Sequence, residues 1–183
     1  MPPYVHKMRV PVTLSQLSRE AREGWCLVSV GSSAGDRPES LLELLNSGSV
    51  VIPFVPEHDS NIVLVTRMHI EWVAVSAGVD APLVAPIDRT VTREQRVELR
   101  FMDQRHLEGI VQWNGSGDHG RLSDFLNGPD DFFLLKTSGG PFLVNRLRLA
   151  ETRMAESTPR PAETEPAQSE RVMPPFKMPT QTA

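Results

Sequence analysis

The sequence predicts a β-rich protein of the α+β class, made by tandem duplication of a β-β-α-β-β unit. One observation is a repeated segment, LVTRMHI at residues 64–70 and LVNRLRL at residues 143–149. Another is that a leucine-rich stretch ending in asparagine, followed by an apolar run, precedes each copy, at residues 41–46 and 122–127. Such self-similarity indicates repeated structural units. Because about 60 residues bury little core alone, we expect two units related by a pseudo-twofold axis, as curved sheets or small barrels with protected edges.

The first unit is expected over residues 1–76. Apolar runs and polar-apolar alternation predict strands over residues 8–14, 24–30, 50–55 and 61–75. Residues 15–23 favour a helical turn, with Ser15 or Ser18 as its cap. The leucine spacing of residues 37–46 predicts a helix. Residues 77–92, which include Pro82 and Pro86, are interpreted as a linker.

The second unit is expected over residues 93–153. Strands are predicted over residues 96–101, 106–113, 131–136 and 142–149. Gly109 falls inside the second of these strands and suggests a bulge. A short helix is expected over residues 121–127, where Asn-Gly-Pro ends the helical pattern.

The last segment, residues 154–183, is rich in Pro, Glu, Ser and Thr and has no hydrophobic periodicity. Such a composition predicts disorder, because burial cannot offset the ordering entropy. One apolar island interrupts it and offers four side chains for docking on a partner groove in an extended conformation: Val172, Met173, Phe176 and Met178. The alternative is an inert end of the tail.

Composition and charge favour a soluble globular protein: 39% of the 183 residues are hydrophobic, 23% are charged, and the net charge is −4. The acidic balance argues against a non-specific nucleic-acid binder. Cys26 is the only cysteine, so no intramolecular disulfide is expected, and its apolar neighbours predict a buried, inert thiol. No apolar run is long enough for a membrane span. The first residues have no signal-peptide core, so a cytoplasmic location is expected.

The glycine-rich segment at residues 115–120 fits the G-x-G-x-x-G pattern of dinucleotide binding. The pattern needs an alternating strand-helix sequence and an acidic residue after the next strand, and both are missing. We therefore interpret the segment as a flexible loop. His119, Ser123 and Asp124 lie close together in sequence, but Ser123 and Asp124 are better explained as residues that start a helix. No catalytic residue is predicted.

No metal or cofactor is expected either. None of the five histidines stands at a metal-ligand spacing, and Glu57-His58-Asp59 is typical of a solvated turn.

The candidate partner-binding residues are arginines at matching positions of the two units. Arg67 and Arg146 lie in the repeated segment, and Arg121 stands before the second leucine-rich helix, close to Asp124. These side chains form either a symmetric set that binds anions or carboxylates, or one structural ion pair per unit, such as Arg121 or Arg146 with Asp124. The three tryptophans (Trp25, Trp72 and Trp113) are expected to pack in the core or between the units.

Residues 121–127 (RLSDFLN), followed by an apolar strand, resemble an R-L-S-D-[FY]-L-N motif of small uncharacterised bacterial proteins. The resemblance covers about residues 95–151 and implies no known activity. In the first unit leucines replace the Ser-Asp pair. The pattern of residues 97–109 also resembles Sm-like or SH3-like small barrels.

The sequence therefore predicts a non-enzymatic, cytoplasmic bacterial protein that acts as a protein-interaction or regulatory module within an assembly. A protein partner is expected, and a homo-oligomer is compatible with the sequence. One alternative is an RNA- or nucleotide-binding regulator that uses the glycine loops and arginines. The other is a small-molecule enzyme with a pocket between the units that holds His119 or His58.

Overall fold

The computed structural model describes residues 6–31, 37–87, 90–115 and 120–155. The first half of the protein contains β1 to β5 with helix α1, and the second half contains β6 to β10 with helix α3. The strands are β1 (Lys7–Gln16), β2 (Arg22–Ser29), β3 (Val51–Pro56), β4 (Val63–Thr66), β5 (Ile70–Val75), β6 (Arg93–Phe101), β7 (His106–Trp113), β8 (Phe132–Thr137), β9 (Gly140–Asn145) and β10 (Leu149–Met154). The helices are α1 (Leu41–Asn46), α2 (Ala81–Val84) and α3 (Leu122–Leu126), with the 3-10 turns η1 (Arg67–His69) and η3 (Arg146–Arg148).

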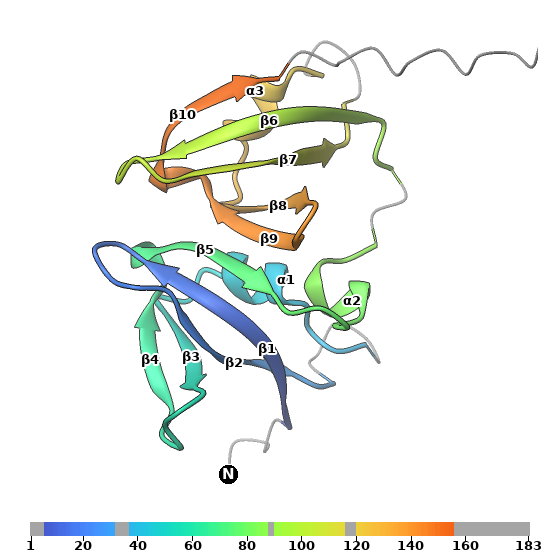
Figure 1. Cartoon of the computed structure of the whole chain (residues 1–183). Coiled ribbons are helices and arrows are strands. Elements are labelled where there is room, and N and C mark those ends of the chain that lie inside the picture. Colours follow the sequence, from blue (N-terminus) through green and yellow to red (C-terminus); the bar gives the residue numbers. More distant parts are fainter. Residues whose placement is uncertain (1–5, 32–36, 88–89, 116–119, 156–183) are drawn as a thin grey trace, which may run out of the picture.

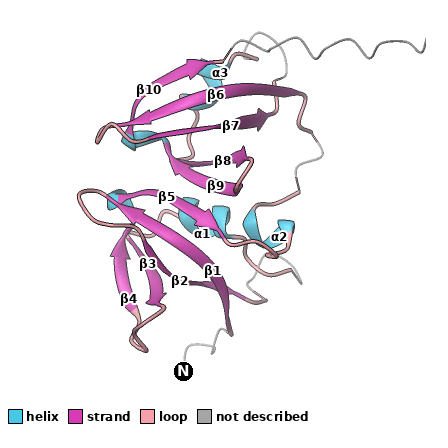
Figure 2. Ribbon diagram, viewed as in Figure 1, coloured by secondary structure: helices cyan, strands magenta, loops and turns pink. Residues whose placement is uncertain are grey.

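All ten strands form one antiparallel sheet in the order β10-β6-β7-β8-β9-β5-β1-β2-β3-β4, and the sheet is not closed into a barrel. Figure 1 shows the two halves one above the other, with β5 and β9 side by side between them. Figure 2 shows how small the helices are beside the strands. The β-rich architecture expected from the sequence is thus confirmed. No helix of the described residues is long and apolar enough to cross a membrane.

The two halves contain the same order of elements, and their strands pair in matching register. Val12 pairs with Gly24 in the first half, as Val97 pairs with Gly109 in the second. The pairing of the last strand with the first is irregular in both halves. The halves meet through unlike edges, however, because β5 pairs with β9 rather than with its counterpart β10. A twofold axis would join like edges, so the expected pseudo-twofold arrangement is not met.

Gly24 and Gly109 allow neighbouring strands to approach closely. A β-carbon on Gly24 would lie 2.2 Å from the carbonyl oxygen of Val55. One on Gly109 would lie 2.6 Å from the carbonyl oxygen of Lys136. The prediction of a bulge at Gly109 is wrong, because β6 and β7 keep one continuous register across it. Glycine is needed at position 109 because the neighbouring strand β8 approaches too closely for a β-carbon. No extra residue is inserted into the β6–β7 ladder.

The core follows the alternation of the strands, as in β1, where Val10, Val12 and Leu14 are all buried. Each half has its own apolar cluster. Phe132 and Leu143 of the second half belong to the cluster of the first, so the two cores adjoin at the β5–β9 junction.

Two of the three tryptophans are placed as expected, whereas Trp25 belongs to neither buried cluster and has the Arg9 guanidinium 5.9 Å from its ring centroid. Trp113 is buried in the core of the second half. Trp72 packs on Phe142 across the junction with ring centroids 5.4 Å apart.

Helix α1 begins at Leu41, four residues later than predicted, because Ser40 caps it. The Ser40 hydroxyl accepts from the backbone N–H of Glu43 at 3.2 Å, and the Glu43 carboxylate accepts from the backbone N–H of Ser40 at 2.9 Å. Arg37 precedes the helix, and its guanidinium also binds this carboxylate. The hydrogen bond from Arg37 lowers the pKa of Glu43 to about 2.

Several other predicted elements are wrong in their extent. Residues 15–23 form no helical turn, since β1 continues to Gln16 and a short hairpin leads directly to β2. The long strands predicted over residues 61–75 and 142–149 are each broken by a 3-10 turn. The break is necessary because β4 pairs with β3 whereas β5 pairs with β1, at the other side of the half. The linker contains α2, and Met154, assigned to the tail, ends β10.

Candidate functional site

Arg67 binds the end of helix α1 and the second half at once. Its Nη1 lies 3.2 Å from the carbonyl oxygen of Leu45 and 2.7 Å from Oδ2 of Asp131, while Nε donates to the carbonyl of Ser49 at 3.0 Å. The first contact satisfies a carbonyl at the helix C-terminus, where a cation is favourable. The second is a salt bridge across the junction, with side chains only 16% and 26% exposed.

Arg146 occupies the matching place in the second half. Its Nη1 donates to the carbonyl oxygen of Leu126 at 3.0 Å, and it also binds the carbonyl of Gly128. Asp124 accepts a hydrogen bond from the backbone N–H of Arg121 at 3.3 Å. Among the described residues no ion pair joins Asp124 to Arg121 or Arg146, contrary to the structural pairing expected from the sequence. The tail residues Val172, Met173, Phe176 and Met178 lie outside the described residues.

Two asparagines hold the junction through the backbone. The Asn46 amide donates to the carbonyl oxygen of Phe132 and accepts from its N–H, both at 2.9 Å. Asn145, which is buried, donates to the carbonyl oxygen of Ile70 at 2.9 Å. These bonds satisfy buried backbone groups that the strands leave open.

A buried carboxylate follows Ile70 directly at this end of the junction. Glu71 is fully buried and pairs with Arg105, which reaches across from the β6–β7 turn. Ser15 donates to Oε2 of Glu71 at 3.2 Å, and Arg105 Nη1 donates to the Ser15 hydroxyl at 3.0 Å. Oε1 of Glu71 is buried without a hydrogen-bond partner.

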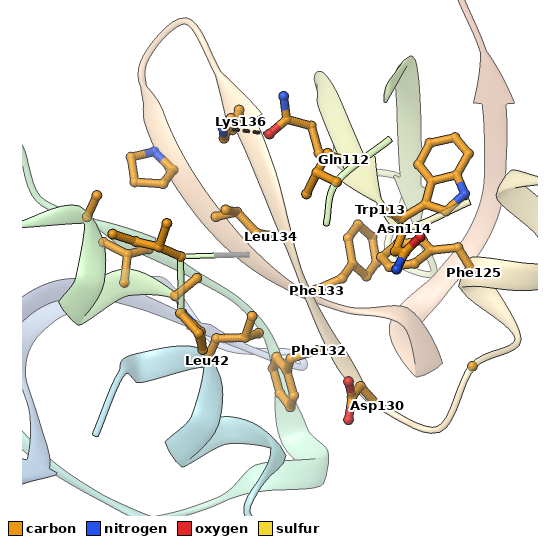
Figure 3. Close-up of a pocket in the computed structure, with 18 of the residues that line it drawn as sticks. Leu42, Gln112, Trp113, Asn114, Phe125, Asp130, Phe132, Phe133, Leu134 and Lys136 are labelled. Atoms are coloured by element: carbon orange, nitrogen blue, oxygen red, sulfur yellow. Dashed lines mark hydrogen bonds between the residues drawn. The ribbon is translucent and has the colours of Figure 1, made fainter. Parts of the chain in front are cut away.

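An apolar groove of about 840 Å³ lies between the halves. One wall comes from α1, α2 and the linker, and the other from β7, β8 and α3. Figure 3 shows the side chains of Leu42 and Leu134 on one side of β8, and those of Trp113 and Phe125 on the other. The apolar lining comprises Leu42, Val79, Ala81, Val84, Ala85, Pro86, Ile87, Val91, Trp113, Phe125, Leu126, Pro129, Phe132, Phe133, Leu134 and Pro141.

Strand β8 lines the groove, and its alternate side chains pack in different cores. Phe132 and Leu134 pack with the cluster of the first half, and Phe133 with that of the second. Phe133 meets the edge of Phe125 at 5.8 Å between ring centroids, and Phe125 stacks on Trp113 at 5.9 Å. These aromatic contacts hold the wall in one geometry.

Few polar groups line the groove. Lys136 donates to Oε1 of Gln112 at 2.7 Å at one end, and Asp130 lies at the opposite end (Figure 3). The groove therefore has a positively charged end at Lys136 and a negatively charged end at Asp130. Apart from these, the polar lining is Asn114, Thr137 and Arg146.

The described residues contain no nucleophile-base pair in the groove and no group of three or more His, Cys, Asp or Glu suited to a metal ion. His58 lies in the turn between β3 and β4, outside the groove lining. His119 and the centre of the glycine-rich segment lie outside the described residues. Cys26 is buried, as predicted, and burial raises the pKa of its thiol to about 12.

Comparisons of the chain with the models of known protein families, with curated proteins and with solved structures find no match.

Sequence reasoning offered a pocket between the units as one alternative, but it did not identify the residues that line the groove. Its residues come from α1, the linker and β8, which are far apart in sequence, and no local pattern shows that they meet. The apolar linker segment at residues 81–87 was an available signal, because a solvated linker is usually polar.

Proposed function

We propose that this protein is a non-enzymatic interaction module of a bacterial assembly, and that the groove between its halves receives an apolar segment of a protein partner. The groove itself carries the proposal, because it is large, lined mainly by apolar side chains, and built by both halves together. Hydrophobic grooves commonly receive the apolar face of a partner segment.

The chemistry of the lining defines the segment that fits. Leucine, isoleucine, valine or phenylalanine side chains would contact Leu42, Leu134 and Phe125. A carboxylate of the partner would meet Lys136, and a basic group would meet Asp130 at the other end. The proposed partner segment is therefore short and apolar, with charges of opposite sign at its two ends.

The arginines support a protein partner over RNA. Arg67 and Arg146 bind carbonyl oxygens inside the protein, and Arg105 pairs with Glu71. These side chains are occupied within the fold, and the net charge of the whole chain is −4. A phosphate backbone requires several available cations on one surface.

Tandem duplication is part of the same proposal. The shared order of elements, the matching pairing registers and the equivalent roles of Arg67 and Arg146 all support descent from one doubled unit. The groove would then have arisen where the two copies met.

Site-specific crosslinking tests the proposal. Cys26 is buried and its thiol stays protonated, so one added surface cysteine can be labelled selectively. Ile87→Cys, at a groove residue that is 70% exposed, would carry a photo-crosslinker. Met102→Cys, 54% exposed and away from the groove, would serve as the control.

We expect cell extracts of the source organism to give a discrete protein adduct with Ile87→Cys only. Ile87→Glu in the label-free chain should abolish co-purification of the same protein. Chains with and without residues 156–183, a truncation that keeps all of β10, should capture it equally if the groove is sufficient. No adduct, or the same adducts from both cysteine positions, would refute the proposal.

A further inference from the structure

Strand β4 forms one end of the sheet and pairs only with β3 among the described residues. Pro53 lies opposite Leu64 and has no N–H, so this pair is the non-hydrogen-bonded kind of an antiparallel ladder. The backbone N–H and C=O of Leu64 therefore point away from β3, toward the open edge of the sheet. An edge of this kind is a template for another strand.

The open edge is apolar, and its strand carries no charge. Leu64 is 65% exposed and Ile62 is 59% exposed, and Val51 on the neighbouring strand is also exposed. Natural edge strands are usually protected by charges, prolines or a covering segment. The opposite end of the sheet follows that rule, since Glu151 and Arg153 of β10 form an ion pair. Figure 1 shows β4 and β10 at opposite ends.

The second half shows which kind of strand pairs with the equivalent edge. Strand β9 stands where β4 stands in the first half, because Val144 pairs with Phe133 as Val65 pairs with Ile52. The other edge of β9 is occupied by β5, in which Val73 pairs with Leu143. Leu143, the counterpart of Leu64, is fully buried and belongs to the apolar cluster of the first half.

We propose that the edge of β4 binds an extended segment of a partner protein, which adds to the sheet as an antiparallel strand. By analogy with β5, this segment is apolar and rich in β-branched residues. Its backbone bonds with Leu64 give affinity, and its alternate side chains cover Leu64 and Ile62. No residue of β4 lines the groove, so a result against the function proposed above would leave this proposal unaffected.

A second copy of the chain fits this edge less well. The position of β10 that matches Val73 is Thr152, and charged Glu151 and Arg153 stand beside it. These charges would face the apolar strand. Two copies of β4 would also form a small contact, because a strand of four residues spans roughly 13 Å. A stable dimer buries about 800 Å² on each partner.

A peptide with the sequence of residues 69–76 (HIEWVAVS) is a defined probe, because it contains the strand that occupies the equivalent edge. Its binding to the full chain can be measured by fluorescence anisotropy, with a scrambled peptide as the control. Leu64→Pro removes the outward N–H and leaves the ladder with β3 intact, since edge strands tolerate proline. Leu64→Lys keeps the N–H and adds a charge at an exposed position. Ile87→Lys, in the groove, is the matched control.

We expect the probe to bind the unchanged chain and the Ile87→Lys chain equally, and at least tenfold more weakly to both Leu64 variants. Thermal unfolding should show that all the variants remain folded. Hydrogen exchange should show that the N–H of Leu64 becomes protected only when the probe is added. Equal binding by the scrambled peptide, absence of binding, or binding that the Leu64 variants do not weaken would overturn the proposal. A concentration-dependent dimer lost in Leu64→Pro would assign the edge to a second copy and would also overturn it.

Discussion

Arg105 should stabilise the protein by compensating a buried charge at the junction. Removing one partner of a buried pair usually costs about 3–5 kcal/mol, because the remaining charge loses its compensation. Two features reduce that cost here. The Arg105 side chain is 39% exposed, so water screens the pair, and Ser15 would still donate to Glu71. We therefore expect Arg105→Met to lower the free energy of unfolding by about 2–3 kcal/mol.

Urea denaturation of four chains measures this effect: the unchanged protein, Arg105→Met, Glu71→Gln and the double variant. Glu71→Gln removes the charge and keeps the shape, so it should cost less than Arg105→Met. The double variant should be more stable than the sum of the single effects predicts, by roughly 1 kcal/mol or more. A melting temperature lower by about 4–12 °C should accompany Arg105→Met. Additive single effects, or an Arg105→Met chain as stable as the original, would refute a compensating role for Arg105.

Three further predictions follow from the contacts of individual residues. Gly109→Ala should destabilise the protein by about 1–3 kcal/mol in urea denaturation, because its β-carbon would meet a backbone oxygen of β8. Gly139→Ala, whose β-carbon would have 3.7 Å to its nearest neighbour, should have little effect, and equal costs would contradict the close approach. Asn46→Ala should lower the free energy of unfolding by about 1–3 kcal/mol, because it leaves buried backbone groups of β8 unpaired. The exposed counterpart Asn127 should tolerate alanine. Equal losses for the two variants in urea denaturation would contradict this role of Asn46. Arg37→Gln should raise the pKa of Glu43 from about 2 toward 4.5 in an NMR titration. Because the folded pKa is lowered, this carboxylate stabilises the fold above its unfolded pKa, and the contribution is lost as the pH falls from about 4.5 to 2. An unchanged pKa of Glu43 would contradict the role given to Arg37.

Much of the fold could be predicted because its signals are local. Alternation along β1, β6 and β7 reflects burial on one face, and the strands appear close to the residues expected from it. The repeated segment around Arg67 and Arg146 indicated equivalent positions, and the structure gives both side chains similar contacts. The β-carbon positions at Gly24 and Gly109 show why these two glycines also recur.

The remaining features depend on long-range pairing, which periodicity does not encode. Nothing in the sequence of β5 indicates that its second neighbour is β9. Glu71 looks like an outward polar residue of a strand, yet it is fully buried and pairs with the half-exposed Arg105 of the β6–β7 turn. β10 was missed in part because Glu151 and Arg153, which suit an edge strand, obscure its alternation. The lining of the groove could not be predicted for the same reason, since three distant segments must meet to form it.

The junction between β5 and β9 has a consequence for the protein as it is synthesised. Strand β5 ends at Val75, and its partner is complete only at Asn145, about 70 residues later. At typical translation rates of roughly 5–20 residues per second, the ribosome needs about 4–14 seconds to deliver that partner. During this interval β5 can pair with β1, but the edge that carries Trp72 and Val73 toward β9 has no partner strand. The first half therefore exposes this sheet edge to other chains until the second half has been synthesised.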